Sequence, residues 1–237
     1  MTEAEWLACL DSLEMVDFLM PSSLPMGFGK VSERKLRLFG CACCRRIWRL
    51  LTDPRSRRAG EAYELFSDNI LSGEEREAAE KQARMANEDA YQRYGYCHHG
   101  IEAVSEAVNY HPFISGVALQ AANAASARNG VGGDDLDHAS FDALLWEKEN
   151  QAQSDLLRCI FGPLPFRPVT LDPAWHSANV TGLAEAIYDE RAFDRLPILA
   201  DALEDAGCTN EDILSHCRGG GEHVRGCWMV DLVLGKE

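Results

Sequence analysis

The chain has 237 residues, of which 46% are hydrophobic and 26% are charged, and its formal net charge is −15. A chain of this length and composition forms one large or two small apolar cores, which excludes an intrinsically disordered protein. The acidic balance would repel a phosphate backbone, and this excludes general nucleic-acid binding.

The sequence predicts a cytoplasmic protein that does not bind a membrane. No apolar run approaches the roughly 18 residues of a membrane span. The start, MTEAEWLACLD, is acidic where a secretory signal would carry lysine or arginine. In a reducing cytoplasm the nine cysteines are core residues, metal ligands or catalytic thiols rather than disulfides.

Several short patterns are typical of helix starts. In the capping box a hydroxyl and a carboxylate three residues later satisfy free backbone amides, and an acidic residue before proline serves the same purpose. These patterns occur at Thr2-Glu3-Ala4-Glu5, Asp53-Pro54, Ser72-Gly73-Glu74-Glu75 and Asp172-Pro173. We therefore expect helices to begin near each of them.

The segment 30–58 carries ten basic residues and only two acidic ones. Its apolar positions recur at helical spacing and predict a core stripe: Leu36, Phe39, Cys43, Ile47 and Leu50. The other face is expected to be solvated: Arg34, Arg37, Arg45 and Arg49. Arginines beside Cys41-Ala42-Cys43-Cys44 would suit a reactive thiol, but the stripe favours cysteine as a small core residue.

Further helices are predicted over 74–94, 113–128 and 141–161, where strong helix formers or apolar residues recur at helical spacing. The proline-rich stretch from Gly162 to Pro168 disfavours helix. We therefore expect an N-terminal helical module over 1–161, a linker over 162–172 and a C-terminal helical module over 173–237.

The C-terminal module contains three compact helical segments, over 182–190, 196–206 and 210–216, with Thr209 as the expected cap of the third. The stretch 228–234 fits either a β-strand or a last helix. Sustained period-two alternation is absent, so the sequence predicts a mainly α, multi-helical globular protein of two packed modules.

Both ends of the chain carry distinctive motifs: the MTEAEWL start, the CACCRRIW helix and the tail HCRGGGEHVRGCWMVDLVLGKE. With these motifs the chain resembles an uncharacterised protein family of planctomycete bacteria of the Gemmata type. The resemblance covers both ends and the FGPLPFRPVTLDPAW linker. It implies no activity, cofactor or partner.

The stretch HCRGGGEHVRGCW, over 216–228, gathers the candidate binding residues: His216, Cys217, Arg218, His223, Arg225 and Cys227. Zinc prefers four sulfur or nitrogen ligands, and Cys208 or a member of the 41–44 group could complete such a set from a distance. Alternatively, the glycines and arginines could cradle an anion. We expect instead a structural role without metal, in which Cys227 and Trp228 are buried and Gly219–Gly221 form a surface turn.

Taken together, these patterns favour a non-enzymatic, cytoplasmic interaction or regulatory module with an unidentified protein partner. This hypothesis depends on the acidic helical composition, the apolar helix faces and the absence of a complete catalytic motif. The alternative is an enzyme that depends on zinc or iron, or on a reactive thiol, and that uses the cysteine and histidine clusters.

Overall fold

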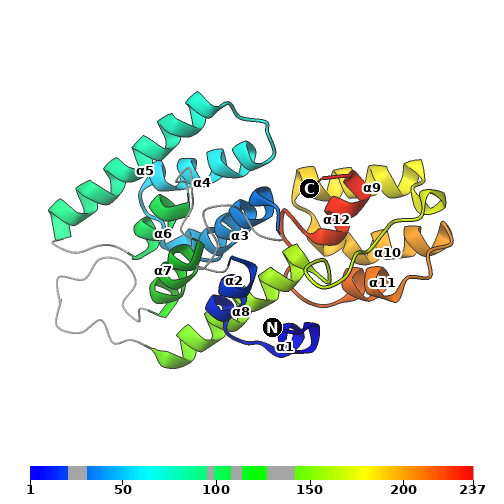
Figure 1. Ribbon diagram of the computed structural model, residues 1–237. Helices are drawn as coiled ribbons and strands as arrows, with labels where there is room; N and C mark the ends of the chain where they lie inside the picture. Colours follow the sequence, from blue (N-terminus) through cyan, green and yellow to red (C-terminus); the bar gives the residue numbers. More distant parts are fainter. Residues whose placement is uncertain (21–30, 95–98, 108–113, 127–141, 237) are drawn as a thin grey trace.

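The computed structural model describes residues 1–20, 31–94, 99–107, 114–126 and 142–236, and all regular structure in these ranges is helical. Figure 1 shows the helices gathered into two lobes. The prediction of a mainly α, multi-helical protein is confirmed. No helix in these ranges is both long and apolar enough to cross a membrane.

The first lobe is built around α3, which packs against α4, α6, α7 and α8 (Figure 1). The predicted core stripe of α3 is confirmed at Leu36, Phe39 and Cys43, each at most 1% exposed. The helices of this lobe are α1 (Glu3–Ala8), α2 (Ser12–Leu19), α3 (Glu33–Arg46), α4 (Pro54–Ser67), α5 (Gly73–Tyr94), α6 (His99–Ala107), α7 (Ile114–Ser126) and α8 (Ala143–Phe161).

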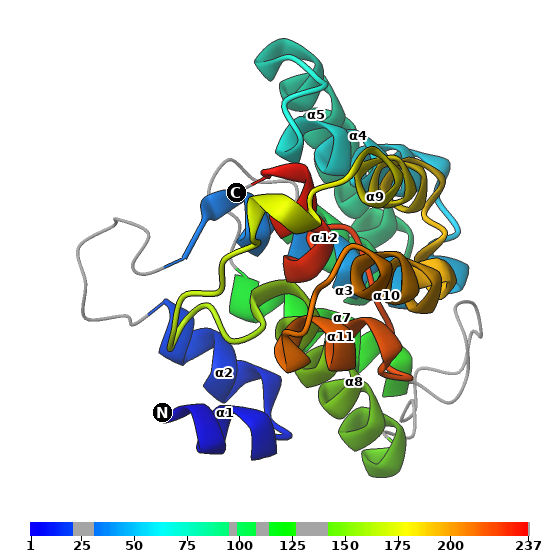
Figure 2. The ribbon, with the colours of Figure 1, turned by 90° about the vertical axis from the view of Figure 1, so that its right-hand side faces the viewer.

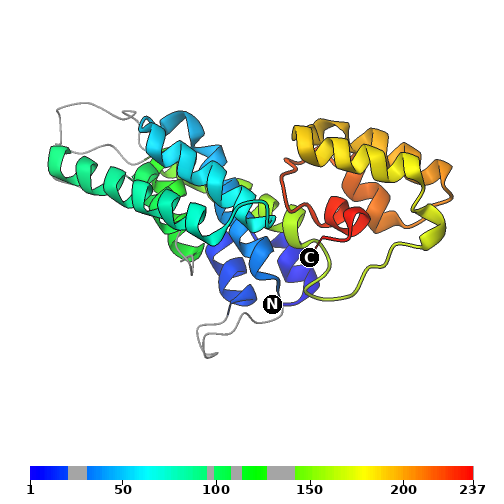
Figure 3. The same ribbon diagram turned by 90° about the horizontal axis from the view of Figure 1, so that it is seen from above.

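The second lobe is a smaller helical group with its own apolar core, drawn from residues 159 to 233. Within it α10 packs against α9 and α11, and α12 packs against α9. Figure 3 shows this lobe beside the first, and Figure 2 looks onto it with the first lobe behind. Its helices are α9 (Ala178–Glu190), α10 (Leu196–Asp205), α11 (Glu211–Arg218) and α12 (Trp228–Leu234).

The helix starts follow the predicted caps with one exception. Both capping boxes are present, and Asp53 caps α4. The expected cap of α11 was wrong, because Asn210 rather than Thr209 precedes the first turn. The Asn210 side chain accepts hydrogen bonds from the amides of Asp212 and Ile213 at 3.0 and 3.4 Å. An Asn side chain reaches these amides, as a cap requires.

Charged side chains from both lobes meet in a buried ion-pair network. Arg34 donates to Asp68, at the end of α4, and to Asp231 of α12, with N–O distances of 2.8 Å to each. Lys35 also binds Asp231, at 3.0 Å. The prediction of a solvated face is confirmed for Arg49, which is exposed, but was wrong for Arg37 and Arg34, whose side chains are only 14% and 11% exposed. The second lobe covers this face of α3, and Asp231 supplies the counter-charge that a buried guanidinium requires.

Gly162 ends α8 and lies against Trp228 of α12. Its φ of +51° favours glycine, and a Cβ at this position would lie 2.4 Å from Cδ1 of Trp228. The Trp228 side chain is only 2% exposed. This close approach fixes the start of α12 against the end of α8.

Candidate metal centre

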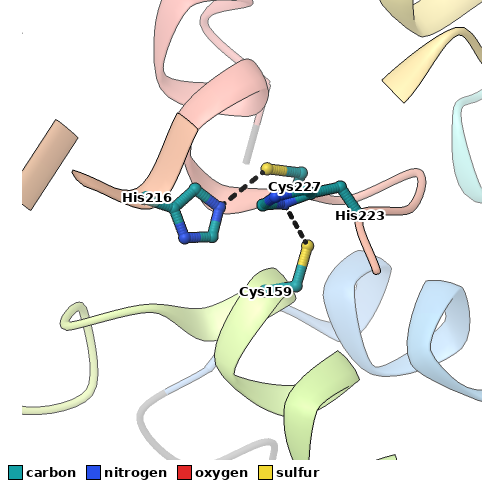
Figure 4. A group of neighbouring side chains, drawn as sticks. All are labelled: Cys159, His216, His223 and Cys227. Atoms are coloured by element: carbon teal, nitrogen blue, oxygen red, sulfur yellow. Dashed lines mark hydrogen bonds between the residues drawn. The ribbon is translucent and has the colours of Figure 1, made fainter. Parts of the chain in front are cut away.

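Four side chains from distant parts of the chain converge where the two lobes meet (Figure 4). Cys159 lies in the last turn of α8, His216 in α11 and His223 in the loop after it. Cys227 is the residue immediately before α12. Figure 4 shows the four side chains pointing toward one another from these separate segments.

The distances within the cluster fit a tetrahedral metal site. One ligand atom from each residue can be chosen so that all four lie within 4.8 Å of one another. The Sγ of Cys159 is 3.5 Å from Nδ1 of His223, and Nε2 of His216 is 3.2 Å from Sγ of Cys227. In a tetrahedral zinc site, bonds of about 2.3 Å to sulfur and about 2.0–2.1 Å to nitrogen place neighbouring S and N atoms about 3.6 Å apart. These two pairs are already close to that spacing, and atoms as far apart as 4.8 Å would approach by about 1 Å when a metal binds.

The histidine rings are also held by contacts other than those with the two cysteines. Nε2 of His223 lies 3.4 Å from the Gly219 carbonyl, so a proton on Nε2 leaves Nδ1 free to bind a metal. The ring of His216 packs against those of His223 and Trp228, with centroid distances of 4.8 and 5.1 Å. Metal-binding histidines in proteins commonly donate their second nitrogen to a carbonyl, as His223 does here.

Burial and hydrogen bonding act differently on the two thiols. Cys159 is 3% exposed and Cys227 is fully buried. Burial raises the pKa of Cys159 well above its usual value, and hydrogen bonding to Cys227 adds to this effect. Burial alone would raise the pKa of Cys227 as well, but hydrogen bonds from Cys159, His216 and His223 bring it well below the usual value. The surroundings of Cys227 therefore favour the thiolate, the form that binds metals.

A cavity of about 450 Å³ adjoins the cluster, and Cys159, His216 and His223 lie on its wall. Its two arginines are already paired with carboxylates. Arg158 binds Asp155 at 2.8 Å, and Arg167 binds Asp212 at 2.6 Å. A small molecule in this cavity would therefore reach the edge of the cluster but would meet no unpaired charge on these two arginines.

The structure brings together three of the six candidate residues from the tail, His216, His223 and Cys227. Cys217 is excluded from the cluster and is fully buried in the apolar core of the second lobe. Arg218 is exposed and pairs with Asp201 and Glu204. Arg225 lies at the lobe interface, 3.3 Å from Asp68.

Several other expectations for the tail and the cysteines are confirmed. Cys227 and Trp228 are buried, and Gly219–Gly221 are exposed. Cys41, Cys43 and Cys44 are at most 3% exposed and belong to the core of the first lobe. Burial raises the pKa of all three thiols, that of Cys44 to about 12. They are therefore core residues rather than reactive thiols.

Sequence reasoning missed Cys159. It lies in a predicted amphipathic helix, where a cysteine reads as an ordinary core residue. The tail offered His216, His223 and Cys227 as ligands, but the expectation that Cys208 or a cysteine at 41–44 completes the set was wrong, since these cysteines lie in the apolar cores outside the cluster. No local pattern shows which distant cysteine completes that set, because Cys159 and His223 are 64 residues apart.

No known protein family, curated protein or solved structure matches the chain.

Proposed function

We propose that this protein binds one zinc ion through Cys159, His216, His223 and Cys227, and that the ion joins the two lobes. The observation that carries the proposal is the convergence of two sulfur and two nitrogen ligand atoms within 4.8 Å of one another. Cys159 comes from the last helix of the first lobe, whereas the other three residues come from the second. A metal at this point is a cross-link between the lobes.

The chemistry of the four side chains supports zinc over other metals. A tetrahedral set of two thiolates and two imidazoles is typical of zinc, whereas calcium and magnesium prefer oxygen ligands. Two thiolates also balance the charge of a divalent ion, so the bound site carries no net charge. This matters because Cys159 and Cys227 are buried, and an unbalanced charge there would be costly to desolvate.

A structural role is favoured over a catalytic one. Structural zinc sites have four protein ligands, whereas catalytic sites have three and keep one position for water or substrate. Four side chains are available here, and they would fill the coordination sphere. We therefore propose a zinc-stabilised, non-enzymatic scaffold or regulatory protein, with a protein partner that is still to be identified.

The adjoining cavity favours a second candidate function, that of a zinc enzyme. If Cys227 left the metal, the remaining ligands would lie on the wall of a cavity large enough for a small substrate. Cobalt substitution separates the two functions, because the visible spectrum of cobalt reports its coordination. An unchanged spectrum on adding imidazole or a small thiol supports the scaffold, and a changed spectrum supports the enzyme.

The zinc proposal itself is tested by metal analysis of protein purified without chelator. We expect about one zinc per chain in the wild type and its loss in Cys159→Ser and His223→Ala. The matched control is Cys217→Ser, which alters a buried cysteine next to His216 that lies outside the cluster. Cys217→Ser should keep its zinc.

Thermal melting with and without chelator provides the second measurement. Because zinc binds the folded chain, a chelator should lower the melting temperature of the wild type and of Cys217→Ser. It should leave Cys159→Ser unchanged. Full zinc occupancy in Cys159→Ser, or wild-type protein that contains no zinc and takes up none, would refute the proposal.

A further inference from the structure

A second cavity, of about 190 Å³, lies at the interface of the lobes, and its charged lining is mainly arginine. Arg45 comes from α3 and Glu64 from α4, both in the first lobe. Arg191, which follows α9, and Arg225, in the loop before α12, come from the second. Three guanidinium groups thus face one carboxylate in a chain whose net charge is −15.

Glu64 does not use all the hydrogen-bond donors around it. It accepts from Nε and NH2 of Arg45 at 3.1 and 2.7 Å, and from both terminal nitrogens of Arg191. A guanidinium has five N–H donors, so each of these arginines keeps donors for another acceptor. Arg45 and Arg191 are 29% and 38% exposed, so a ligand from solvent can reach them.

Arg225 is the least satisfied of the three. Its side chain is only 11% exposed, and its Nε is buried with no hydrogen-bond partner in the described part of the chain. Its one hydrogen bond there is a 3.3 Å contact from NH1 to Asp68, whose carboxylate already binds Arg34 and Tyr188. A buried donor without an acceptor destabilises a fold, so such donors in native proteins are normally met by a partner.

We propose that this cavity binds a small oxyanion, a phosphate or carboxylate group, between Arg45, Arg191 and Arg225. Guanidinium forks match both groups and bind them through pairs of parallel hydrogen bonds. The ligand adds negative charge where three arginines have only Glu64 and a share of Asp68 as counter-charges, and it gives the unused Arg225 donors an acceptor. The cavity wall also includes His223, so the anion would bind beside the zinc site. Because these arginines belong to both lobes, the anion also strengthens the interface.

The test uses the full chain with its bound metal, and inorganic phosphate as the probe. Phosphate near ten times its dissociation constant should raise the melting temperature by about 3–6 °C over chloride of equal ionic strength. Succinate is run in parallel. A rise with phosphate alone identifies a phosphate site, and a rise with succinate alone identifies a carboxylate site.

Variants show whether the effect belongs to the cavity. Arg225→Gln and Arg191→Gln should each reduce the shift at least severalfold. If Arg225→Gln unfolds because it loses the contact with Asp68, Arg191→Gln still provides the test. Arg218→Gln is the matched control, because Arg218 also pairs with two carboxylates of the second lobe but lies outside the cavity. It should keep the full shift.

Two results would overturn the proposal. One is no stabilisation by either anion beyond that given by chloride, and the other is a shift in Arg225→Gln and Arg191→Gln equal to that of the wild type. Zinc content is measured on the same samples. If protein that contains zinc shows no anion stabilisation, the zinc proposal still stands. If protein without zinc shows anion stabilisation that the cavity variants lose, the anion proposal still stands.

Discussion

Replacing Gly162 with alanine tests how tightly the two lobes are locked together. Gly162 has φ +51° and ψ −138°, a backbone conformation that residues other than glycine rarely adopt. The added Cβ would lie 2.4 Å from Cδ1 and 2.6 Å from Cγ of Trp228. Trp228 is only 2% exposed and so has little room to move away.

Two costs add in Gly162→Ala. The backbone strain is about 1–3 kcal/mol. Overpacking against a buried ring adds about 1–3 kcal/mol. For a chain of this size each kcal/mol lowers the melting temperature by about 2–4 °C, so a combined cost of about 4 kcal/mol gives a fall of about 8–16 °C.

The assay is thermal melting of the metal-loaded protein, followed by circular dichroism or calorimetry. The control is Gly182→Ala, since Gly182 lies within α9 and a Cβ there meets nothing within 4 Å. Alanine is the better helix former, so this variant should melt at or slightly above the wild-type temperature. A Gly162→Ala protein that melts within about 2 °C of the wild type would refute the close packing of Gly162 on Trp228.

The burial of other side chains leads to three further predictions. Trp228→Ala should lower the free energy of unfolding by about 3–5 kcal/mol in denaturant titrations, and a loss below about 1 kcal/mol would contradict its core position. Glu64→Gln removes the counter-charge of Arg45 and Arg191 and should lower the free energy of unfolding by about 2–4 kcal/mol near neutral pH. The loss is smaller than for a fully buried pair because both arginines are partly exposed. Burial alone would raise the pKa of Glu64, but the two arginines hold it below 4.5, so its contribution is present above that pH. The difference between wild type and variant should shrink as the pH falls through the lowered pKa, and a pH-independent difference would count against this. Alkylation of the native protein, read by peptide mass spectrometry, should modify the half-buried Cys9 well before the buried Cys41, Cys43 and Cys44; equal labelling would show that the α3 thiols are accessible.

Most of the helices could be predicted from the sequence, because their signals are local. The capping boxes at Thr2 and Ser72 and the apolar stripe of α3 each lie within a few turns of chain. Local patterns were ambiguous where the element was short. The stretch 228–234 fitted both strand and helix, and packing against α9 accompanies the helical form.

The candidate site could be predicted only in part. The tail placed His216, His223 and Cys227 near one another, and the burial of Cys227 and Trp228 followed from their spacing. The spacing did not show that Cys217, next to His216, points into the core instead. The α11 helix turns these neighbours in different directions, so only one of them faces α8.

The sequence by itself determined the helical class and most of the core faces, because helix periodicity acts over short stretches of chain. It also placed three of the four clustered side chains among six candidates, without separating them from the other three. Only the tertiary structure decided the rest. Cys159 joins the cluster because the second lobe docks on the end of α8, 64 residues before His223. Arg34 is buried because the same docking brings Asp231 to it from 197 residues away. Contacts at such separations depend on how whole lobes pack, and no local spacing encodes that.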